Sequence, residues 1–280
     1  MNKVACIIIF YNPTAEDIAY ATYMAEHWEG VIVDNSQNPC MPTEHVGKMA
    51  YICNGANLGI AEAQNIGIRH VLSYTASSHI VFFDQDSRVA VDYPQRMAKE
   101  FETVRSTVGN LVLLGPTVVR KDDGQEYRSA VHHYDCDRQG FSRRSHIISS
   151  GSCLLTEALN TVGLMESRLF IDYVDFEWCW RAINSGYSVG ITSNVTLAHK
   201  VGQKELSIGR HKVIISAPTR YFYQYRNFLW LLRRKYVPLQ WKLATGAKFC
   251  LRLFYLPFCV DKGLECWKNM LRGIKAGLFR

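Results

Sequence analysis

The chain has 280 residues, 48% of them hydrophobic, and a net charge of +7. This length and composition exclude a disordered chain and allow one large α/β domain with an appendage. The nine cysteines are scattered without a Cys-x-x-Cys pair, which argues against zinc and favours free thiols in a reducing compartment. The positive charge favours an acidic partner such as nucleotide phosphates, nucleic acid or an anionic membrane.

Neither end of the chain shows a targeting or spanning segment. The first apolar run stops at Tyr11-Asn12-Pro13 and no small-residue cleavage site follows, so a signal peptide is not expected. A run of about 20 apolar residues is needed to cross a bilayer. The sequence holds no such run, so no transmembrane helix is expected.

Apolar runs alternate with amphipathic stretches along the first 120 residues. The pattern predicts buried strands at residues 4–10, 31–33, 51–53, 80–83 and 111–119. It predicts helices from Thr14, a capping residue, to about Trp28, and over residues 60–72 and 94–104. The polar residues 37–48 are expected to form a loop. This alternation is typical of a parallel, doubly wound sheet.

The next hundred residues are less regular. Residues 121–145 are polar and predict an excursion or hairpin. Strands are then expected at 153–155, 187–191 and 195–199, and helices at 157–162 and 175–184. Ser185-Gly186 closes the second helix at the position where Gly is favoured.

Two carboxylates, Asp84 and Asp86, directly follow the strand at residues 80–83. In an extended chain both side chains would point to the same side. Ligands of open α/β sheets bind at the carboxyl ends of the strands, and hard oxygen ligands there suit Mg²⁺ or Mn²⁺ shared with a diphosphate. The alternative is a solvated turn, since Asp and Ser are common turn residues.

Two further stretches are expected at the same edge of the sheet. Asp34 ends the strand at 31–33 and could accept a hydrogen bond from the N3–H of a pyrimidine base. Residues 57–67 carry small residues where a helix N-terminus must approach a ligand closely. They lack the GxGxxG spacing, which disfavours a dinucleotide-binding fold.

The composition changes after about residue 218. From Arg220 to Arg280 there are thirteen Lys and Arg against two acidic residues, with aromatic and aliphatic residues at helical spacing. This pattern favours basic amphipathic helices on an anionic membrane surface. Ordinary packed helices with a solvated cationic face are the alternative, and nucleic-acid binding is disfavoured because no recognisable motif accompanies the charge. We therefore expect a catalytic domain at 1–218 and a basic helical appendage at 219–280.

In order, these motifs resemble the family 2 glycosyltransferases of the GT-A fold, which use nucleotide-diphosphate sugars. The resemblance spans about residues 4–202. Phe-Asp-Gln-Asp-Ser at 83–87, preceded by NxGxAxAxNxG at 57–67, is similar to the bacterial rhamnosyltransferase branch, in which Arg226 and Asn227 also recur. The resemblance implies an α/β, GT-A fold with a mostly parallel central sheet, helices on both faces and C-terminal helices.

The resemblance also implies roles for individual residues. Asp84 and Asp86 match the metal-binding DxD motif, with Asp86 the usual metal contact and His199 a further candidate on metal or diphosphate. The residues implied in nucleotide-sugar binding are Tyr11, Asn12, Asp34, Asn57, Gly59, Asn65, Asp84, Gln85, Ser150, Gly151 and Arg181.

An inverting transfer needs one base to deprotonate the acceptor hydroxyl. Asp175 matches the family's base position, although Val174 replaces the usual preceding Glu, and Asp172 and Glu177 are the fallback candidates. The alternative for Glu177 and Arg181 is a structural i, i+4 ion pair.

The implied function is an inverting transfer of a hexose, L-rhamnose from dTDP-rhamnose, onto a lipid-linked oligosaccharide in O-antigen or capsule synthesis. Such an enzyme would be peripheral on the cytoplasmic face of a bacterial inner membrane and would bind no nucleic acid. Two alternatives are a UDP-hexose transferase of the same family and a non-catalytic sugar-nucleotide-binding protein. A nucleotidyltransferase is disfavoured, because residues 11–14 are not a Gly-rich basic loop.

Overall fold

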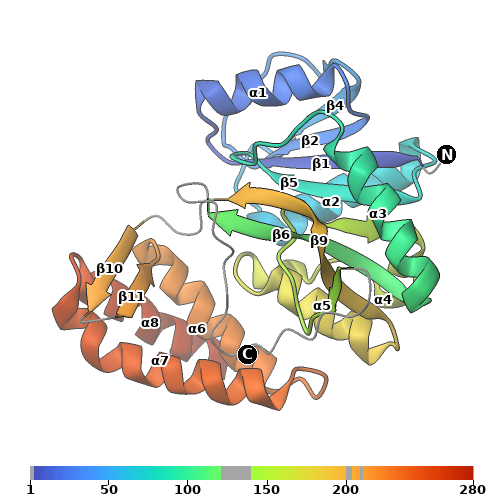
Figure 1. Ribbon diagram of the computed structural model, residues 1–280. Helices are drawn as coiled ribbons and strands as arrows, with labels where there is room; N and C mark the ends of the chain where they lie inside the picture. Colours follow the sequence, from blue (N-terminus) through green and yellow to red (C-terminus); the bar gives the residue numbers. More distant parts are fainter. Residues whose placement is uncertain (1–2, 121–139, 200–203, 209–210, 280) are drawn as a thin grey trace.

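The computed structural model describes residues 3–120, 140–199, 204–208 and 211–279 (Figure 1). A nine-stranded sheet runs in the order β3-β4-β2-β1-β5-β8-β6-β9-β7, and a separate two-stranded sheet pairs β10 with β11. The strands are β1 (Val4–Phe10), β2 (Gly30–Asp34), β3 (His45–Val46), β4 (Met49–Cys53), β5 (His79–Asp84), β6 (Leu111–Arg120), β7 (Phe141–Arg143), β8 (Cys153–Leu155), β9 (Ser188–His199), β10 (Lys204–Ile208) and β11 (His211–Ile215).

The helices divide between the sheet and the C-terminal part of the chain. Those around the sheet are α1 (Ala15–Ala25), α2 (Gly59–Tyr74), α3 (Tyr93–Val108), α4 (Leu159–Val162) and α5 (Val174–Asn184), with short 3-10 turns η1 (Thr156–Ala158) and η2 (Ser167–Leu169). The C-terminal ones are α6 (Pro218–Leu232), α7 (Leu239–Cys259) and α8 (Gly263–Leu278), drawn in orange and red in Figure 1.

Strand β1 lies at the centre of the parallel half of the sheet and is buried on both faces. Ala5, Ile7 and Ile9 pack into the apolar cluster that α2, α4 and α5 help to form. The alternate residues Cys6, Ile8 and Phe10 pack into the cluster on the other face, under α1 and α3. A strand covered on both faces needs apolar residues at every position, which explains the unbroken run in the sequence.

The sheet is more mixed than the expected mostly parallel one. Strands β4, β2, β1 and β5 are parallel to one another, and β6 is parallel to β9. Strand β8 is inserted antiparallel between β5 and β6, and the edge strands β3 and β7 are also antiparallel. The expected α/β architecture with helices on both faces is confirmed, but the parallel pairing dominates only its N-terminal half.

Most expected elements form, and the differences are local. Thr14 caps α1 as expected, accepting a hydrogen bond from the amide of Asp17 in a reciprocal capping box. The expected loop at 37–48 contains the two-residue strand β3, and the two strands expected at 187–199 form one continuous strand, β9. The hairpin of β10 and β11 was not expected. Of the polar excursion at 121–145, residues 121–139 lie outside the described residues.

The C-terminal helices do not form a detached appendage. Helix α6 begins at Pro218, as the expected boundary suggests, but its Arg220 forms an ion pair with Asp172 of the preceding domain. Trp180 of α5 packs with Leu231 and Trp241, which come from α6 and α7. Within the described part of the chain, each helix is too short or too polar to cross a bilayer. The division at residue 218 stays a prediction about sequence modules.

Gly30, the first residue of β2, provides a stability test of this core. Its φ is +141°, and a Cβ there would lie 1.9 Å from the carbonyl oxygen of Cys6 in β1. We expect Gly30→Ala to destabilise the protein by roughly 3 kcal/mol or more, because backbone on both strands must move. Gly109, at φ +80° with no atom within 4 Å of a built Cβ, is the matched control. We expect Gly109→Ala to cost about 1–2 kcal/mol. Denaturant unfolding measures both, and equal losses would contradict the clash.

Candidate active site

The carboxyl ends of three parallel strands meet at one edge of the sheet. Phe10 of β1 is in register with Asp34 of β2, and Ile9 is in register with Asp84 of β5. The turn after β1 is hydrogen-bonded to both neighbours. The amide of Tyr11 donates to Oε1 of Gln85 at 2.7 Å. The amide of Asn12, whose φ is +47°, donates to Oγ of Ser36 at 2.8 Å.

The sequence predicted that the two carboxylates of the DxD motif lie on one extended stretch, but the structure shows otherwise. Strand β5 ends at Asp84, and the amide of Ser87 donates to the carbonyl of Asp84 at 3.0 Å, which closes a turn. Asp84 is half-buried and Asp86 is exposed. The two carboxylates therefore differ in their exposure to solvent. A turn was the alternative that the sequence left open, because Asp and Ser are compatible with both conformations.

Arg88 holds this turn against α1. Its guanidinium donates to the carbonyl of Gln85 at 2.8 Å and to Oδ1 of Asp17 at 2.6 Å. The same guanidinium lies 4.5 Å from the centre of the Tyr20 ring. The turn that carries Asp86 is thus fixed on one side by a buried ion pair and on the other by Gln85.

Ser150 and Gly151 form a second wall next to β5. The amide of Gly151 donates to the carbonyl of Phe82 at 2.7 Å, and the hydroxyls of Ser150 and Ser87 lie 2.9 Å apart. Gly151 has φ +72°, and a Cβ there would lie 2.6 Å from the hydroxyl of Tyr93. A side chain at this position would therefore be both strained and sterically blocked.

Asp175 lies in the first turn of α5 and reaches the same site. Its pKa is raised to about 7, because burial and the negative charge of Asp84 outweigh the backbone hydrogen bonds, among them those from Phe176 and Ser149, that lower it. The amide of Phe176 donates to Oδ1 of Asp175 at 3.0 Å. The structure thus brings together two carboxylates that are far apart in the sequence. A carboxylate with a pKa near 7 is suited to accept a proton at neutral pH.

The two fallback bases, Asp172 and Glu177, are both paired within the protein in this structure. Asp172 forms an ion pair with Arg220, with Oδ1 and Nη2 2.5 Å apart. Glu177 is 0% exposed, and its Oε1 accepts hydrogen bonds from Arg181 at 2.7 Å and from Tyr236 at 2.5 Å.

Arg181, predicted to contact the sugar nucleotide, has its partners within the protein in this structure. Its Nε binds Glu177, its Nη1 donates to the carbonyl of Val162 at 2.6 Å, and its Nη2 donates to the carbonyl of Leu164 at 2.7 Å. All three nitrogens of the guanidinium are therefore used inside the protein. The i, i+4 ion pair, which the sequence offered as the alternative, is what forms.

Asn65 is likewise structural. Its amide group exchanges two hydrogen bonds with the backbone of Met165 and donates a third to Oγ of Ser167. The side chain is buried, and its hydrogen bonds are to other parts of the protein. Asn65 ties α2 to the segment that precedes the α5 loop.

Asp34 stands at the expected edge but faces the protein. Its side chain is 0% exposed and accepts hydrogen bonds from the amides of Ser36 and Cys40 and from the hydroxyl of Tyr51, the last at 2.6 Å. Burial raises the pKa of Asp34, but these hydrogen bonds outweigh it and hold the pKa below its usual range. For Asp34 to contact a pyrimidine base, as the sequence predicts, the loop at residues 36–40 would have to open.

Asn57 and Gly59 shape the N-terminus of α2 at this edge. Oδ1 of Asn57 accepts a hydrogen bond from the amide of Gly59 at 3.0 Å. Gly59 has φ +83°, and a Cβ there would lie 2.5 Å from the carbonyl oxygen of Phe170. The small residue lets the helix approach the loop that leads to Asp175.

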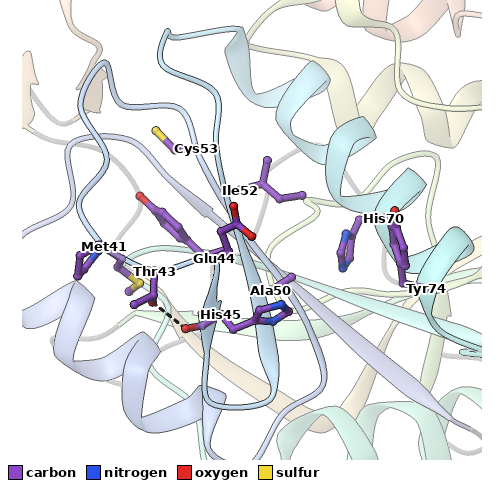
Figure 2. Close-up of a pocket in the computed structure, with 11 residues that line it drawn as sticks. Met41, Thr43, Glu44, His45, Ala50, Ile52, Cys53, His70 and Tyr74 are labelled. Atoms are coloured by element: carbon purple, nitrogen blue, oxygen red, sulfur yellow. Dashed lines mark hydrogen bonds between the residues drawn. The ribbon is translucent and has the colours of Figure 1, made fainter.

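A separate hollow lies at the outer edge of the sheet (Figure 2). This cavity of about 710 Å³ is lined by β3, β4, the loop before them and the end of α2, including His45 and His70. It contains none of the residues predicted for the site. Tyr51, which also lines it, is linked to the site by its hydrogen bond to Asp34.

The residues that could hold a metal are Asp84 and Asp86. His199 ends β9, and its side chain lies outside the described part of the structure. Among the described residues, no group of three or more His, Cys, Asp or Glu side chains could hold a metal ion. Mg²⁺ is commonly bound by one or two carboxylates plus substrate phosphates, so the two carboxylates are of the chemical type that fits such an ion.

Sequence reasoning missed Arg220, which pairs with Asp172 and lies within electrostatic reach of Asp175. No local signal marks it, because Arg220 is only one of many cations in the C-terminal segment.

Comparisons with known proteins were made by sequence and by structure. No family model matches the chain. The dTDP-rhamnosyl transferase RfbF of Shigella flexneri is 34% identical over 252 residues, which cover 85% of this chain and 82% of that protein.

Two solved structures illustrate the structural similarity. S. aureus TarS in complex with UDP-GlcNAc has a TM-score of 0.57 at 12% identity, covering 98% of this chain and 81% of that chain. GalNAc-T7 with UDP, GalNAc and Mn²⁺ has a TM-score of 0.53 at 14% identity, covering 71% of this chain and 44% of that chain. At these identities the similarity establishes a common fold.

The raised pKa of Asp175 predicts a pH-dependent gain in stability on Asp175→Asn. The folded state binds a proton up to about pH 7, whereas the unfolded carboxyl loses it near 3.8. Ionisation therefore weakens the native state increasingly as the pH rises from about 4 to 7. We expect the variant to be more stable than the wild type by roughly 1–3 kcal/mol at pH 8, and equally stable near pH 4. Denaturant unfolding across this range tests it, and a difference independent of pH would contradict the raised pKa.

Proposed function

Because this chain belongs to the family 2 glycosyltransferases of the GT-A fold, together with the Shigella flexneri dTDP-rhamnosyl transferase, we propose that it transfers L-rhamnose from dTDP-rhamnose to an acceptor hydroxyl with inversion. The GT-A fold expected from the sequence is confirmed by the solved glycosyltransferase structures. The observation that carries the proposed mechanism is the half-buried carboxylate of Asp175, with a pKa near 7, at the carboxyl edge of the parallel strands.

Asp175 is the proposed general base. Its carboxylate takes the proton of the acceptor hydroxyl while the hydroxyl oxygen bonds to the anomeric carbon of the sugar. The bond from that carbon to the diphosphate oxygen breaks on the opposite side, and dTDP leaves with the bonding electrons. General base catalysis of this kind is worth about 10²–10⁴ in rate when the base pKa is close to the working pH.

The donor is proposed to lie along the ends of β1 and β5. Tyr11, Asn12 and Gln85 line one side, Ser150 and Gly151 line the other, and Asn57 and Gly59 present the N-terminus of α2. Helix N-termini and their free amides attract phosphate groups. Asp34 would contribute through the loop that it holds.

Asp86 and Asp84 are the proposed holders of Mg²⁺ or Mn²⁺. The similar GalNAc-T7 structure contains Mn²⁺ with UDP. When bound, such an ion supplies positive charge that stabilises the leaving diphosphate. Asp86, exposed on its turn, is accessible to an ion that arrives with the donor, while Asp84 lies deeper, beside Asp175.

A donor panel tests the proposed function. We expect purified protein with Mg²⁺ or Mn²⁺ to turn over dTDP-rhamnose, and UDP-hexoses at least tenfold more slowly, when given extracted lipid-linked intermediates and read by mass. Asp175→Asn is expected to lower kcat by 10²–10⁴ with little change in dTDP affinity measured by calorimetry. Preferential turnover of a UDP-hexose would overturn the donor, and full activity of Asp175→Asn would overturn the base. Absence of any nucleotide binding would contradict both the dTDP-rhamnose transferase and the UDP-hexose transferase.

The acceptor is proposed to be a lipid-linked oligosaccharide of a bacterial surface polysaccharide, such as O-antigen or capsule, presented at the cytoplasmic face of the inner membrane. Helix α7 supports this proposal with a stripe of exposed apolar residues at intervals of three, four or eight: Leu239, Leu243, Leu251, Phe254 and Phe258. Helix α8 adds Leu264, Trp267, Leu271 and Leu278, with Lys268, Arg272 and Lys275 also exposed.

Exposed apolar stripes on a strongly basic unit are typical of helices that lie in an anionic membrane interface. Phe254 and Phe258, at 76% and 86% exposure, would insert deepest because their rings already stand clear of the protein. The basic side chains would add attraction to anionic headgroups within a Debye length of the surface.

Vesicle binding tests this surface. We expect the double variant Phe254→Ser, Phe258→Ser to bind vesicles of phosphatidylglycerol and phosphatidylcholine at least tenfold more weakly than the wild type, because two ring insertions are lost. Tyr74→Ser, which removes a ring of 78% exposure on α2, is the matched control and should bind as the wild type does. Wild-type binding should weaken with added salt. If the wild type instead forms a dimer and binds no vesicles, and the double variant is a monomer, the stripe is a protein interface.

A further inference from the structure

We propose that Asn227 of α6 is a positioning residue, which holds the loop at residues 168–173 and through it sets the place of the Asp175 carboxylate. The inference rests on the proposed role of Asp175 as the base. It makes α6 part of the catalytic apparatus, rather than part of a separate helical appendage.

The loop that leads to Asp175 has an unfavourable backbone. Phe170, Asp172 and Tyr173 have φ values of +66°, +67° and +67°. Residues with a Cβ rarely adopt this left-handed region, and they do so only where surrounding structure enforces it. Tyr173 is the N-cap of α5 and offers no side-chain cap. Asp175 follows two residues later, so relaxation of the loop would reorient the first turn that carries it.

Asn227 supplies much of the enforcement. Its side chain is 0% exposed, and its Nδ2 donates to the carbonyls of Leu169 at 2.9 Å, Ile171 at 2.8 Å and Asp172 at 3.1 Å. An amide has only two N–H groups, so three carbonyls converge on both of them. These carbonyls belong to the left-handed segment itself. Replacing the amide would leave buried acceptors without a donor.

Arg226 reinforces the same contact. Its Nε and Nη2 donate to Oδ1 of Asn227 at 3.0 and 2.9 Å, which fixes the orientation of the Asn227 amide. Its Nη2 also donates to the carbonyls of Arg168 and Leu169, both at 2.9 Å. Two neighbouring side chains of α6 therefore bind four consecutive or near-consecutive carbonyls of one loop.

The loop is held from two sides. On α6, the ring of Tyr223 stacks on Phe170 at 4.7 Å with an interplanar angle of 10°. Arg220, Tyr223 and Asn227 are spaced to share one face of the helix. Opposite them, the amide of Ala61 at the start of α2 donates to the carbonyl of Phe170 at 3.4 Å. The loop therefore joins the proposed donor side of the site to the C-terminal helices.

The other faces of α6 are fixed by α7 and α8. The hydroxyl of Tyr225 donates to the carbonyl of Phe249 in α7 at 2.8 Å. A Cβ on Gly273 of α8 would lie 2.4 Å from the carbonyl oxygen of Phe222. Because α6 is packed on all these sides, Asn227 is a rigid point of attachment for the loop.

The test compares Asn227→Ala with Asn269→Ala, a control that removes an amide from α8 whose Nδ2 donates to the local carbonyl of Glu265. Hydrogen exchange of the full chain, without substrate, reports the order of the loop. We expect amides at residues 169–176 to exchange at least tenfold faster in Asn227→Ala than in the control, with thermal unfolding still cooperative. With dTDP-rhamnose, we expect kcat to fall at least tenfold while the donor KM changes less than twofold.

A merely structural role would leave kcat per folded molecule unchanged, or would leave loop exchange unchanged, and either result overturns the inference. If Asn227→Ala does not fold, Arg226→Gln, which removes the guanidinium from the same carbonyls, is measured in its place against the same criteria. If the wild type fails to turn over dTDP-rhamnose, the proposed function fails. The exchange comparison still decides whether Asn227 orders the loop.

Discussion

The alignment of β1, β2 and β5 is the constraint on which the site depends. Strand β1 is apolar on both faces, so it can only lie at the centre of the sheet with helices above and below it. Parallel pairing on both sides then places the ends of three strands at one edge. Each strand ends in a residue or turn that binds its neighbour, as the contact from Tyr11 to Gln85 shows. The polar edge follows from the apolar core.

The second half of the chain brings a charge conflict to this edge. Asp175 is placed in a partly buried position near Asp84, where both desolvation and like charge oppose its ionisation. The arrangement weakens the folded state at neutral pH, which is typical of a carboxylate retained for its reactivity rather than for stability. Glu177, two residues later, is also buried, but its Oε1 accepts hydrogen bonds from Arg181 and Tyr236.

The sequence predicted the frame better than the side-chain partners. Strand positions follow from apolar runs, and the cap at Thr14 follows from local hydrogen bonding, so both could be predicted. The turn at residues 84–87 could be given only as an alternative, because the same residues tolerate a strand. For Asn65 and Arg181 the sequence predicts ligand contacts, whereas the structure gives both side chains partners elsewhere in the protein. The polarity of a side chain does not reveal whether its partner is a substrate or a distant backbone carbonyl. The pairing of Arg220 with Asp172 joins residues 48 apart and depends on how α6 docks.

The docking of α6 also changes how the chain is divided. Composition separates a catalytic domain from a basic tail at residue 218, but hydrogen bonds cross that boundary. Through Arg226 and Asn227, α6 donates five hydrogen bonds to backbone carbonyls of the loop at 168–173. A left-handed loop has little stability of its own, so its support must come from a packed element. Helix α6 meets that need because α7 and α8 hold it from behind. The helices whose exposed stripes suit a membrane are therefore connected, through one helix, to the residue proposed to activate the acceptor.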